Sequence, residues 1–266
     1  MLKVGMVGLG VMGQGMAKNL AEAGFLTMIY NRTIEKAHTF GEILDVSVAL
    51  SIEELAAHVD VVCLCVSRDE DLLEVVHTLT KTIKPNSIVV DMSTVSSETA
   101  KKAGAILVEK QVAFLDAPVS GGVEGAKNGK LAMMVGGDLE ALEKARPVLE
   151  ALAARIIYMG ATGSGQATKA VNQIMGAGIN QAVTEALAFA QAQGLALDKV
   201  IDVISGGASG NWFLQHRGWT MTQGTFAPGF KLALHHKDLK ICQSMVAQTG
   251  FSVSVRRDRL SLDLVL

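Results

Sequence analysis

The chain has little of what marks a secreted, fibrous or nucleic-acid-binding protein. Its 266 residues include 4 prolines and 3 cysteines, too few for a disulfide framework, which fits a reducing compartment. Neither sign of charge dominates, because 24 lysines and arginines stand against 26 aspartates and glutamates. The sequence therefore has no electrostatic footprint for nucleic acid or for an anionic membrane, and we expect neither as a partner.

Export and membrane signals are also missing from the sequence. The opening MLKVGMVGLGVMG lacks the charged, apolar and small-residue zones of a signal peptide. The longest apolar stretch, 170–197, is interrupted by amides and a glutamate that a bilayer core would not tolerate. We therefore expect this stretch to be a buried helix of a soluble, cytoplasmic protein.

Strand-like and helix-like segments alternate through the first half of the chain. The segments that read as buried strands are 3–7, 26–30, 60–66, 87–91, 112–119, 130–137 and 154–159. Amphipathic segments lie between the first five of them, near 12–23, 33–41, 51–58, 69–82 and 96–109, and a helix is expected at 138–152. This alternation predicts an α/β fold, a doubly wound parallel sheet of the Rossmann type with helices on both faces.

Only helices are expected after the glycine-rich turn 160–165. Their predicted ranges are 165–193, 197–205, 210–223 and 231–249, with Gly194 and Gly250 as helix C-terminal caps. Trp212 is expected to be buried in the helical core, and the alternative is that it forms an apolar wall of a site. We therefore predict two domains, a dinucleotide-binding domain over 1–162 and an all-helical substrate and oligomerisation domain over 163–266.

Three glycines follow the first strand directly, in the sequence GLGVMG, and open the next helix. Gly8 would permit a tight turn, Gly10 would let a pyrophosphate approach the backbone, and Gly13 would let helix and strand pack closely. A glycine turn without a ligand is the alternative, which the flanking strand and helix disfavour. The residues expected to bind the cofactor here are Gly8, Leu9, Gly10, Val11, Met12 and Gly13.

The end of the second strand carries no acid where an NAD site usually has one. Asn31, Arg32 and Thr33 stand there instead, and a guanidinium and a hydroxyl suit a ribose 2′-phosphate. These residues predict that NADP(H) is preferred and NAD(H) is possible. The alternative is that Arg32 is a solvated residue and Thr33 only a helix N-cap.

Two lysines lie in otherwise apolar helical segments. Lys169 and Asn172 are three residues apart, which places them on one helical face, and Lys169 is either exposed at the helix start or desolvated for a task. Lys237 and Asp238 read most simply as a surface ion pair. The adjacent histidines before them lack the spacing of metal ligands, so no metal site is expected.

Four blocks, in this order, resemble the β-hydroxyacid dehydrogenase family: GLGVMGQGMAKNL, DAPVSGG, GSGQATKAVNQ and KDL. The resemblance covers nearly the whole chain. Within the family, the NRT after the second strand is similar to the branch of NADPH-dependent glyoxylate and succinic semialdehyde reductases. Relatives that reduce imines lack a lysine where this chain has Lys169, which favours carbonyl chemistry.

The resemblance implies a role for particular residues of this chain. Lys169 is implied to be the catalytic lysine, and Asn172 its partner on the same helix. Ser120, Gly121 and Gly122 would hold the substrate carboxylate, Lys237 would lie beside the nicotinamide and the substrate, and Val66 and Thr94 would be further cofactor contacts. At Ser67 the family usually has proline, so the loop there is expected to differ.

The expected reaction is hydride transfer from nicotinamide to the aldehyde carbon of a small carboxylate-bearing substrate, with Lys169 as general acid. An alternative is a 3-hydroxyacid dehydrogenase of the 3-hydroxyisobutyrate or tartronate semialdehyde type. A second alternative is a non-catalytic NADP(H)-binding protein. The family's helical domains pair, which predicts a homodimer or homotetramer, whereas the unusual sequence of 254–266 predicts a shortened or altered C-terminus.

Overall fold

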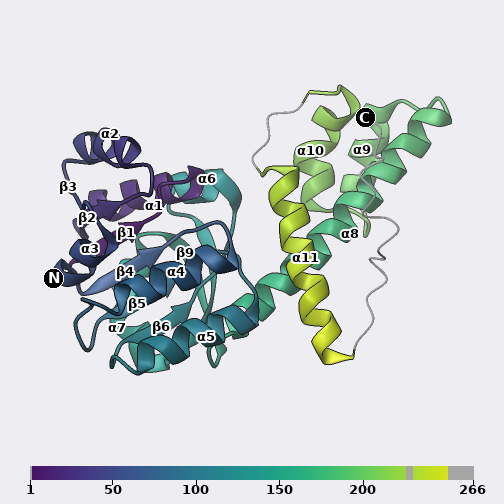
Figure 1. Ribbon diagram of the computed structural model, residues 1–266. Helices are drawn as coiled ribbons and strands as arrows, with labels where there is room; N and C mark the ends of the chain where they lie inside the picture. The colour runs from purple at the N-terminus through teal and green to yellow at the C-terminus, as the bar shows by residue number, and fades with distance from the viewer. Residues whose placement is uncertain (1, 226–229, 251–266) are drawn as a thin grey trace. The chain divides into compact units, whose positions relative to one another are not determined.

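The computed structural model describes residues 2–225 and 230–250 (Figure 1). The expectation of an altered C-terminus at 254–266 lies outside the described residues. The chain forms two compact units, Met1–Ala170 and Val171–Leu266. The division falls inside a long helix, because the first turns of that helix are hydrogen-bonded to the first unit.

The first unit contains a mixed sheet of nine strands among the described residues. The strands are β1 (Val4–Val7), β2 (Leu26–Tyr30), β3 (Ser47–Val48), β4 (Val61–Leu64), β5 (Ile88–Asp91), β6 (Ala113–Asp116), β7 (Val119–Ser120), β8 (Leu131–Gly137) and β9 (Ala153–Gly160). Their order is β3-β2-β1-β4-β5-β6-β8-β7, and β9 pairs with β8. The doubly wound fold expected from the sequence is confirmed.

The parallel pairing expected for the sheet does not extend to β8. This strand runs antiparallel to β6 and β7, with Asp116 opposite Gly136 and Ser120 opposite Ala132. The physical reason is the short connection between β7 and β8, which holds only the six-residue helix α6 (Gly122–Lys127). A parallel return needs a crossover of about a dozen residues or more, so β8 comes back beside β6 and β7 as in a hairpin.

Seven helices of the first unit, as far as the structure describes it, surround the sheet. They are α1 (Val11–Glu22), α2 (Ile34–Leu44), α3 (Ile52–His58), α4 (Asp69–Leu79), α5 (Ser97–Val108), α6 and α7 (Leu139–Glu150). One buried cluster includes Met6 with Met16 and Leu142, and another includes Val7 with Leu55 and Leu107. Figure 1 shows α4 and α5 lying side by side over one face of the sheet. Helices therefore cover both faces.

The second unit is helical in its described part. Its helices are α8 (Ser164–Ala192), which begins in the first unit, α9 (Leu197–Ser205), α10 (Trp212–Thr222) and α11 (Leu232–Thr249). Gly194 and Gly250 both have a φ of 69°, the left-handed conformation that glycine tolerates at the end of a helix. The two predicted caps are confirmed. No helix among the described residues is long and apolar enough to cross a membrane.

Two burial expectations are wrong: that Trp212 lies in the helical core, and that the stretch 170–197 is a buried helix. Trp212 is 55% exposed rather than buried, and Met175 and Phe189 of α8 are 61% and 66% exposed. The buried apolar cluster of this unit consists of Val183, Leu187 and Leu214 within the described residues. The described helices therefore cover only part of the surface of α8, and much of its apolar side is open.

Gly165 and Gly176 are a matched pair on α8. A Cβ at Gly165 would collide with the carbonyl oxygens of Asp116 and Met134, whereas a Cβ at Gly176 would meet nothing within 4 Å. We expect Gly165→Ala to lower the free energy of unfolding by roughly 1 to 3 kcal/mol. Gly176→Ala should raise it by about 0.5 to 1 kcal/mol, because alanine favours a helix. Urea denaturation measures both values, and equal effects of the two changes would contradict the packing.

Candidate active site

The three glycines after β1 have three different environments. Gly8 has a φ of 96°, and a Cβ there would collide with the carbonyl of Cys65 after β4. A Cβ at Gly13 would collide with the carbonyl of Gly8, whereas a Cβ at Gly10 would meet nothing within 4 Å. Gly8 and Gly13 are therefore required by the fold itself, and the open space at Gly10 is the cradle that a side chain would fill.

The N-terminus of α1 faces this cradle without a side chain to satisfy it. Its N-cap residue is Gly10, which makes no side-chain cap, and its first turn holds no acidic residue. By contrast, the first turn of α4 carries Asp69, Glu70 and Asp71. Free N–H groups and the helix dipole at α1 suit a phosphate. The loop also lies where the strand order reverses between β1 and β4, the place where such sheets bind dinucleotides. The residues present therefore fit a dinucleotide pyrophosphate.

The three residues after β2 have separate contacts. The side-chain oxygen of Asn31 accepts the N–H of Leu9 at 2.9 Å, and its Nδ2 donates to the carbonyl of Thr33 at 3.0 Å, so Asn31 fixes the glycine loop. Thr33 is the N-cap of α2, but its hydroxyl makes no capping hydrogen bond. The guanidinium of Arg32 is 84% exposed and lies 3.3 Å from a carboxylate oxygen of Asp71. An anion at this place would compete with Asp71 for Arg32.

The loops after β4 and β5 are joined by Ser93. Its hydroxyl accepts the N–H of Val66 at 2.8 Å, and its own N–H donates to Oδ1 of Asp91 at 3.0 Å. Val66 and Thr94, the two expected cofactor contacts, therefore belong to one hydrogen-bonded group of loops. Sequence reasoning missed Ser93, whose hydroxyl has no distinctive spacing.

The start of α8 is bound to the end of β6. Asp116 is fully buried, and its two carboxylate oxygens accept the N–H groups of Gly163 at 2.7 Å and Gln166 at 2.9 Å. Burial raises the pKa of Asp116, and these backbone hydrogen bonds oppose the rise. The first turn of α8 is thereby fixed at the carboxyl edge of the sheet.

Lys169 lies on this first part of α8 and is desolvated. It is 8% exposed, and its Nζ donates to the carbonyl of Val119 at 2.9 Å. The sequence allowed Lys169 to be either exposed at the start of the helix or desolvated, and its burial excludes the exposed position. Val119 precedes Ser120, so Lys169 is anchored beside the expected carboxylate loop. Gly121 and Gly122 in that loop have φ values of 125° and 60°, which side chains rarely adopt.

A second polar network lies within the helical unit. Asn172 donates to the side-chain oxygen of Gln173 at 2.8 Å, and Gln173 donates to Oδ2 of Asp238 at 2.7 Å. Oδ1 of Asp238 lies 3.1 Å from the Nζ of Lys237. Asp238 is 3% exposed and Gln173 is 6% exposed. The expected surface ion pair is therefore wrong for Asp238, whose carboxylate is buried with two partners.

The structure thus groups the expected site residues by unit. The glycine loop, Val66, Thr94, Ser120 and Lys169 belong to the first unit, and Asn172 and Lys237 belong to the second. Sequence reasoning missed the roles of Gln166 and Gln173. Both amides are buried. In the sequence, the only signal was a polar amide residue within an otherwise apolar helical segment.

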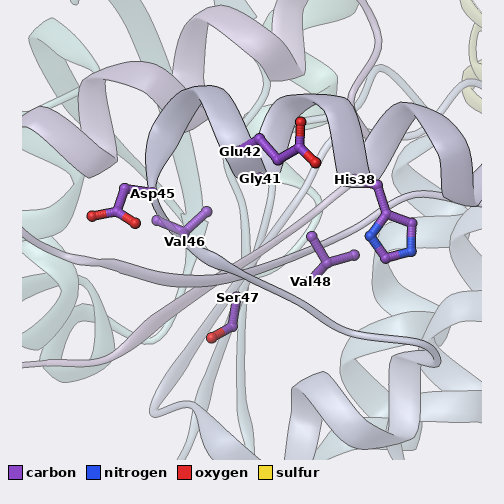
Figure 2. A pocket seen from close by; sticks show the side chains of 7 residues that line it. All are labelled: His38, Gly41, Glu42, Asp45, Val46, Ser47 and Val48. Atoms are coloured by element: carbon purple, nitrogen blue, oxygen red, sulfur yellow. The ribbon is translucent and has the colours of Figure 1, made fainter.

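A surface pocket lies elsewhere in the first unit, between α2 and β3 (Figure 2). Its lining residues are His38, Gly41, Glu42, Asp45, Val46, Ser47 and Val48. None of the expected site residues lines it. Among the described residues, no group of three or more histidine, cysteine, aspartate or glutamate side chains is placed to hold a metal ion.

Family models match both parts of the chain. Residues 3–160 match the model described as the NAD binding domain of 6-phosphogluconate dehydrogenase. Residues 163–258 match the model described as NAD-binding of NADP-dependent 3-hydroxyisobutyrate dehydrogenase. Together the two matches span nearly the whole chain.

Similar proteins come from several bacteria. An uncharacterised oxidoreductase of Shewanella frigidimarina is 40% identical over 96% of this chain and 89% of its own length. The 2-hydroxy-3-oxopropionate reductase of Escherichia coli is 37% identical over 90% of this chain and 82% of its own length. The structure of Mycobacterium tuberculosis 3-hydroxyisobutyrate dehydrogenase with L-serine is 34% identical, with a TM-score of 0.88 over 96% of this chain and 89% of that one.

Asp91 makes stability depend on pH. Burial raises its pKa from 3.8 to about 7, the nearby Asp116 and Asp69 add to the rise, and Oδ2 has no hydrogen-bond partner among the described residues. The protonated carboxyl is thus preferred in the folded state. Its stabilising contribution is complete below about pH 4 and is lost as the pH rises through about 7.

We therefore expect Asp91→Asn to gain stability over the wild type as the pH rises from about 4 to about 7, by up to on the order of 4 kcal/mol. The exposed Asp202→Asn is the control. Chemical denaturation across this pH range measures the difference in unfolding free energy. A difference that stays constant with pH would show that Asp91 does not titrate in this range.

Proposed function

The chain belongs to the β-hydroxyacid dehydrogenase family and is an NAD(P)-dependent oxidoreductase, and from that premise we propose that it is an NADPH-dependent reductase of small aldehyde acids. Glyoxylate and succinic semialdehyde are the proposed substrates. The observation that carries the proposal is the buried Lys169, whose ammonium is anchored at Val119, next to the Ser120 loop.

In the proposed reaction, Lys169 acts as the general acid during reduction and as the general base during oxidation. When bound, the reduced nicotinamide cofactor supplies the hydride that the aldehyde carbon accepts. The Nζ of Lys169 donates a proton to the oxygen that becomes the hydroxyl, and its positive charge stabilises the developing alkoxide. Lys169 then regains a proton from solvent, and in the oxidising direction the same amine accepts the hydroxyl proton.

Ser120, Gly121 and Gly122 would hold the substrate carboxylate through one hydroxyl and two backbone N–H groups. The positive φ of both glycines supports this role, because a loop without side chains lets a carboxylate approach the backbone. Asn172 and Lys237 are the further residues that the family resemblance assigns to this reaction. A carboxylate bound by so short a loop favours small acids.

For the cofactor, the proposal is that the site prefers NADPH to NADH. The exposed guanidinium of Arg32 and the absence of an acid among Asn31, Arg32 and Thr33 support a site for the ribose 2′-phosphate. A 2′-phosphate carries more charge than the single carboxylate of Asp71, so it would displace Asp71 from Arg32.

A second candidate is a dehydrogenase of the 3-hydroxyisobutyrate or tartronate semialdehyde type, which would use the same residues. The names of the similar proteins from Escherichia coli and Mycobacterium tuberculosis favour it, and the latter holds L-serine, which is a 3-hydroxy acid. Initial rates with glyoxylate, succinic semialdehyde, tartronate semialdehyde and 3-hydroxyisobutyrate, each with NADP(H) and NAD(H), rank the two candidates. A chain that binds NADPH without turnover of any of them would instead be the non-catalytic binding protein.

The role of Lys169 is tested by Lys169→Met, which keeps most of the side-chain volume and removes the charge. We expect kcat with glyoxylate to fall by roughly 10²- to 10⁴-fold, the usual contribution of a general acid. Affinity for NADPH should stay within about twofold, because the glycine loop is unchanged. Lys144→Met, at an exposed helical position, is the control. Turnover close to that of the wild type would remove Lys169 from the chemistry.

The preference for NADPH is tested by Arg32→Asp. We expect the affinity for NADPH to fall roughly tenfold or more, the value of a hydrogen-bonded charge pair, while the affinity for NADH changes little. Asp71→Asn is the matched variant, because it removes the carboxylate that competes for Arg32, and it should strengthen NADPH binding. Fluorescence titration of both cofactors measures these values. An unchanged ratio of the two affinities in Arg32→Asp would refute the 2′-phosphate site.

A further inference from the structure

One buried amide connects the loop after β5 with helix α8. Gln166 is 1% exposed. Its Nε2 donates to the carbonyl of Ser93 at 2.8 Å, and its Oε1 accepts the N–H of Val95 at 3.3 Å. Thr94 is the residue between these two, so the side chain of Gln166 holds the backbone on both sides of Thr94.

The backbone of Gln166 is fixed as well. Its N–H donates to Asp116 at 2.9 Å, which binds the first turn of α8 to the end of β6. Lys169 follows three residues later, so both side chains leave the same face of the helix. A shift of Gln166 would therefore move the Thr94 loop relative to the turn that carries Lys169.

Ser93 extends this connection to the loop after β4, because its hydroxyl accepts the N–H of Val66. Both loops follow strands on the side of β1 that is opposite to β2. In a fold of this type the end of β2 faces the adenosine ribose, and the N-terminus of α1 faces the pyrophosphate. The loops at Val66 and Thr94 are thus on the side where the nicotinamide half of the dinucleotide lies.

We propose that Gln166 is a positioning residue that holds the Thr94 loop, and with it the nicotinamide half of the cofactor, in register with the turn of α8 that carries Lys169. The inference rests on the proposed function for the identity of the cofactor and goes beyond it in assigning Gln166.

The chemistry of the side chain suits this task. An amide offers a donor and an acceptor without charge, and the two backbone groups that flank Thr94 require one of each. A carboxylate at this position would lack the donor and would add a negative charge to a region that already buries Asp91 and Asp116. An apolar side chain of the same length would fill the space but would leave both backbone groups without their partner.

Gln166→Met makes this last change and leaves the backbone contact with Asp116 in place. Gln191→Met makes the same change at an exposed position of the same helix and is the control. Binding of two ligands is compared: NADPH, and 2′,5′-ADP, which lacks the nicotinamide half. We expect Gln166→Met to raise the dissociation constant of NADPH roughly 5- to 10-fold and that of 2′,5′-ADP less than about twofold.

Equal weakening of the two ligands, or no weakening of either, would overturn the positioning role. A merely structural role predicts equal weakening, because loss of folded protein affects every ligand alike. The kcat with glyoxylate is expected to fall roughly tenfold or more, with KM for glyoxylate within about twofold. A wild-type chain that binds NADPH and reduces no aldehyde acid would refute the proposed function, but the comparison of the two ligands would still test Gln166.

Gln166→Glu is a second variant, for the case in which the methionine variant does not fold. Glutamate keeps the acceptor for Val95, and it has the donor for Ser93 only when protonated. NADPH affinity relative to the wild type should therefore recover as the pH is lowered from about 8 to about 6. Asp69, Asp91 and Asp116 are present in both proteins, so the effects of these carboxyl groups on binding largely cancel in the ratio. A ratio that does not change with pH would overturn the inference.

Discussion

The buried carboxylate of Asp116 is the contact on which the rest of the site depends. It accepts two N–H groups from the start of α8, so it satisfies a helix N-terminus that would otherwise be buried without partners. Gly136 and Gly165 lack a Cβ where one would collide with Asp116, which lets strand, carboxylate and helix approach this closely. The position of Lys169 at the carboxyl edge of the sheet follows from that contact.

Much of the first unit could be predicted because its strands read as short apolar runs, and the central strands β1, β4 and β5 are buried along their whole length. The strand predicted at 26–30 has these bounds in the structure, and those predicted at 3–7 and 87–91 begin one residue later. The two-residue β3, the six-residue α6 and the antiparallel β8 were not predicted. Such short elements show no periodicity, and the direction of a strand depends on its connection rather than on its own residues.

The candidate site was predicted where the chemistry leaves a mark in the local sequence. A Cβ at Gly8 or Gly13 would collide with the backbone, so glycine is required at both positions and the spacing of the two glycines in the sequence predicts the turn. Gln166 and Gln173 left no such mark, because the groups that accept from their side-chain nitrogens, the carbonyl of Ser93 and the carboxylate of Asp238, lie 73 and 65 residues away. For Lys169 the sequence allowed two environments, and its burial beside the carbonyl of Val119, 50 residues distant, distinguishes them.

The two lysines of the proposed site differ in what their removal would leave behind. Lys237 lies beside the buried carboxylate of Asp238, so its loss would leave a buried charge short of its cation, at a cost to folding as well as to any chemistry. The ammonium of Lys169 donates to a neutral carbonyl, and the loss of such a hydrogen bond costs only about 1 to 3 kcal/mol. Substitution of Lys169 therefore separates catalysis from stability more cleanly, whereas lost activity at Lys237 would not by itself assign that residue a role in the reaction.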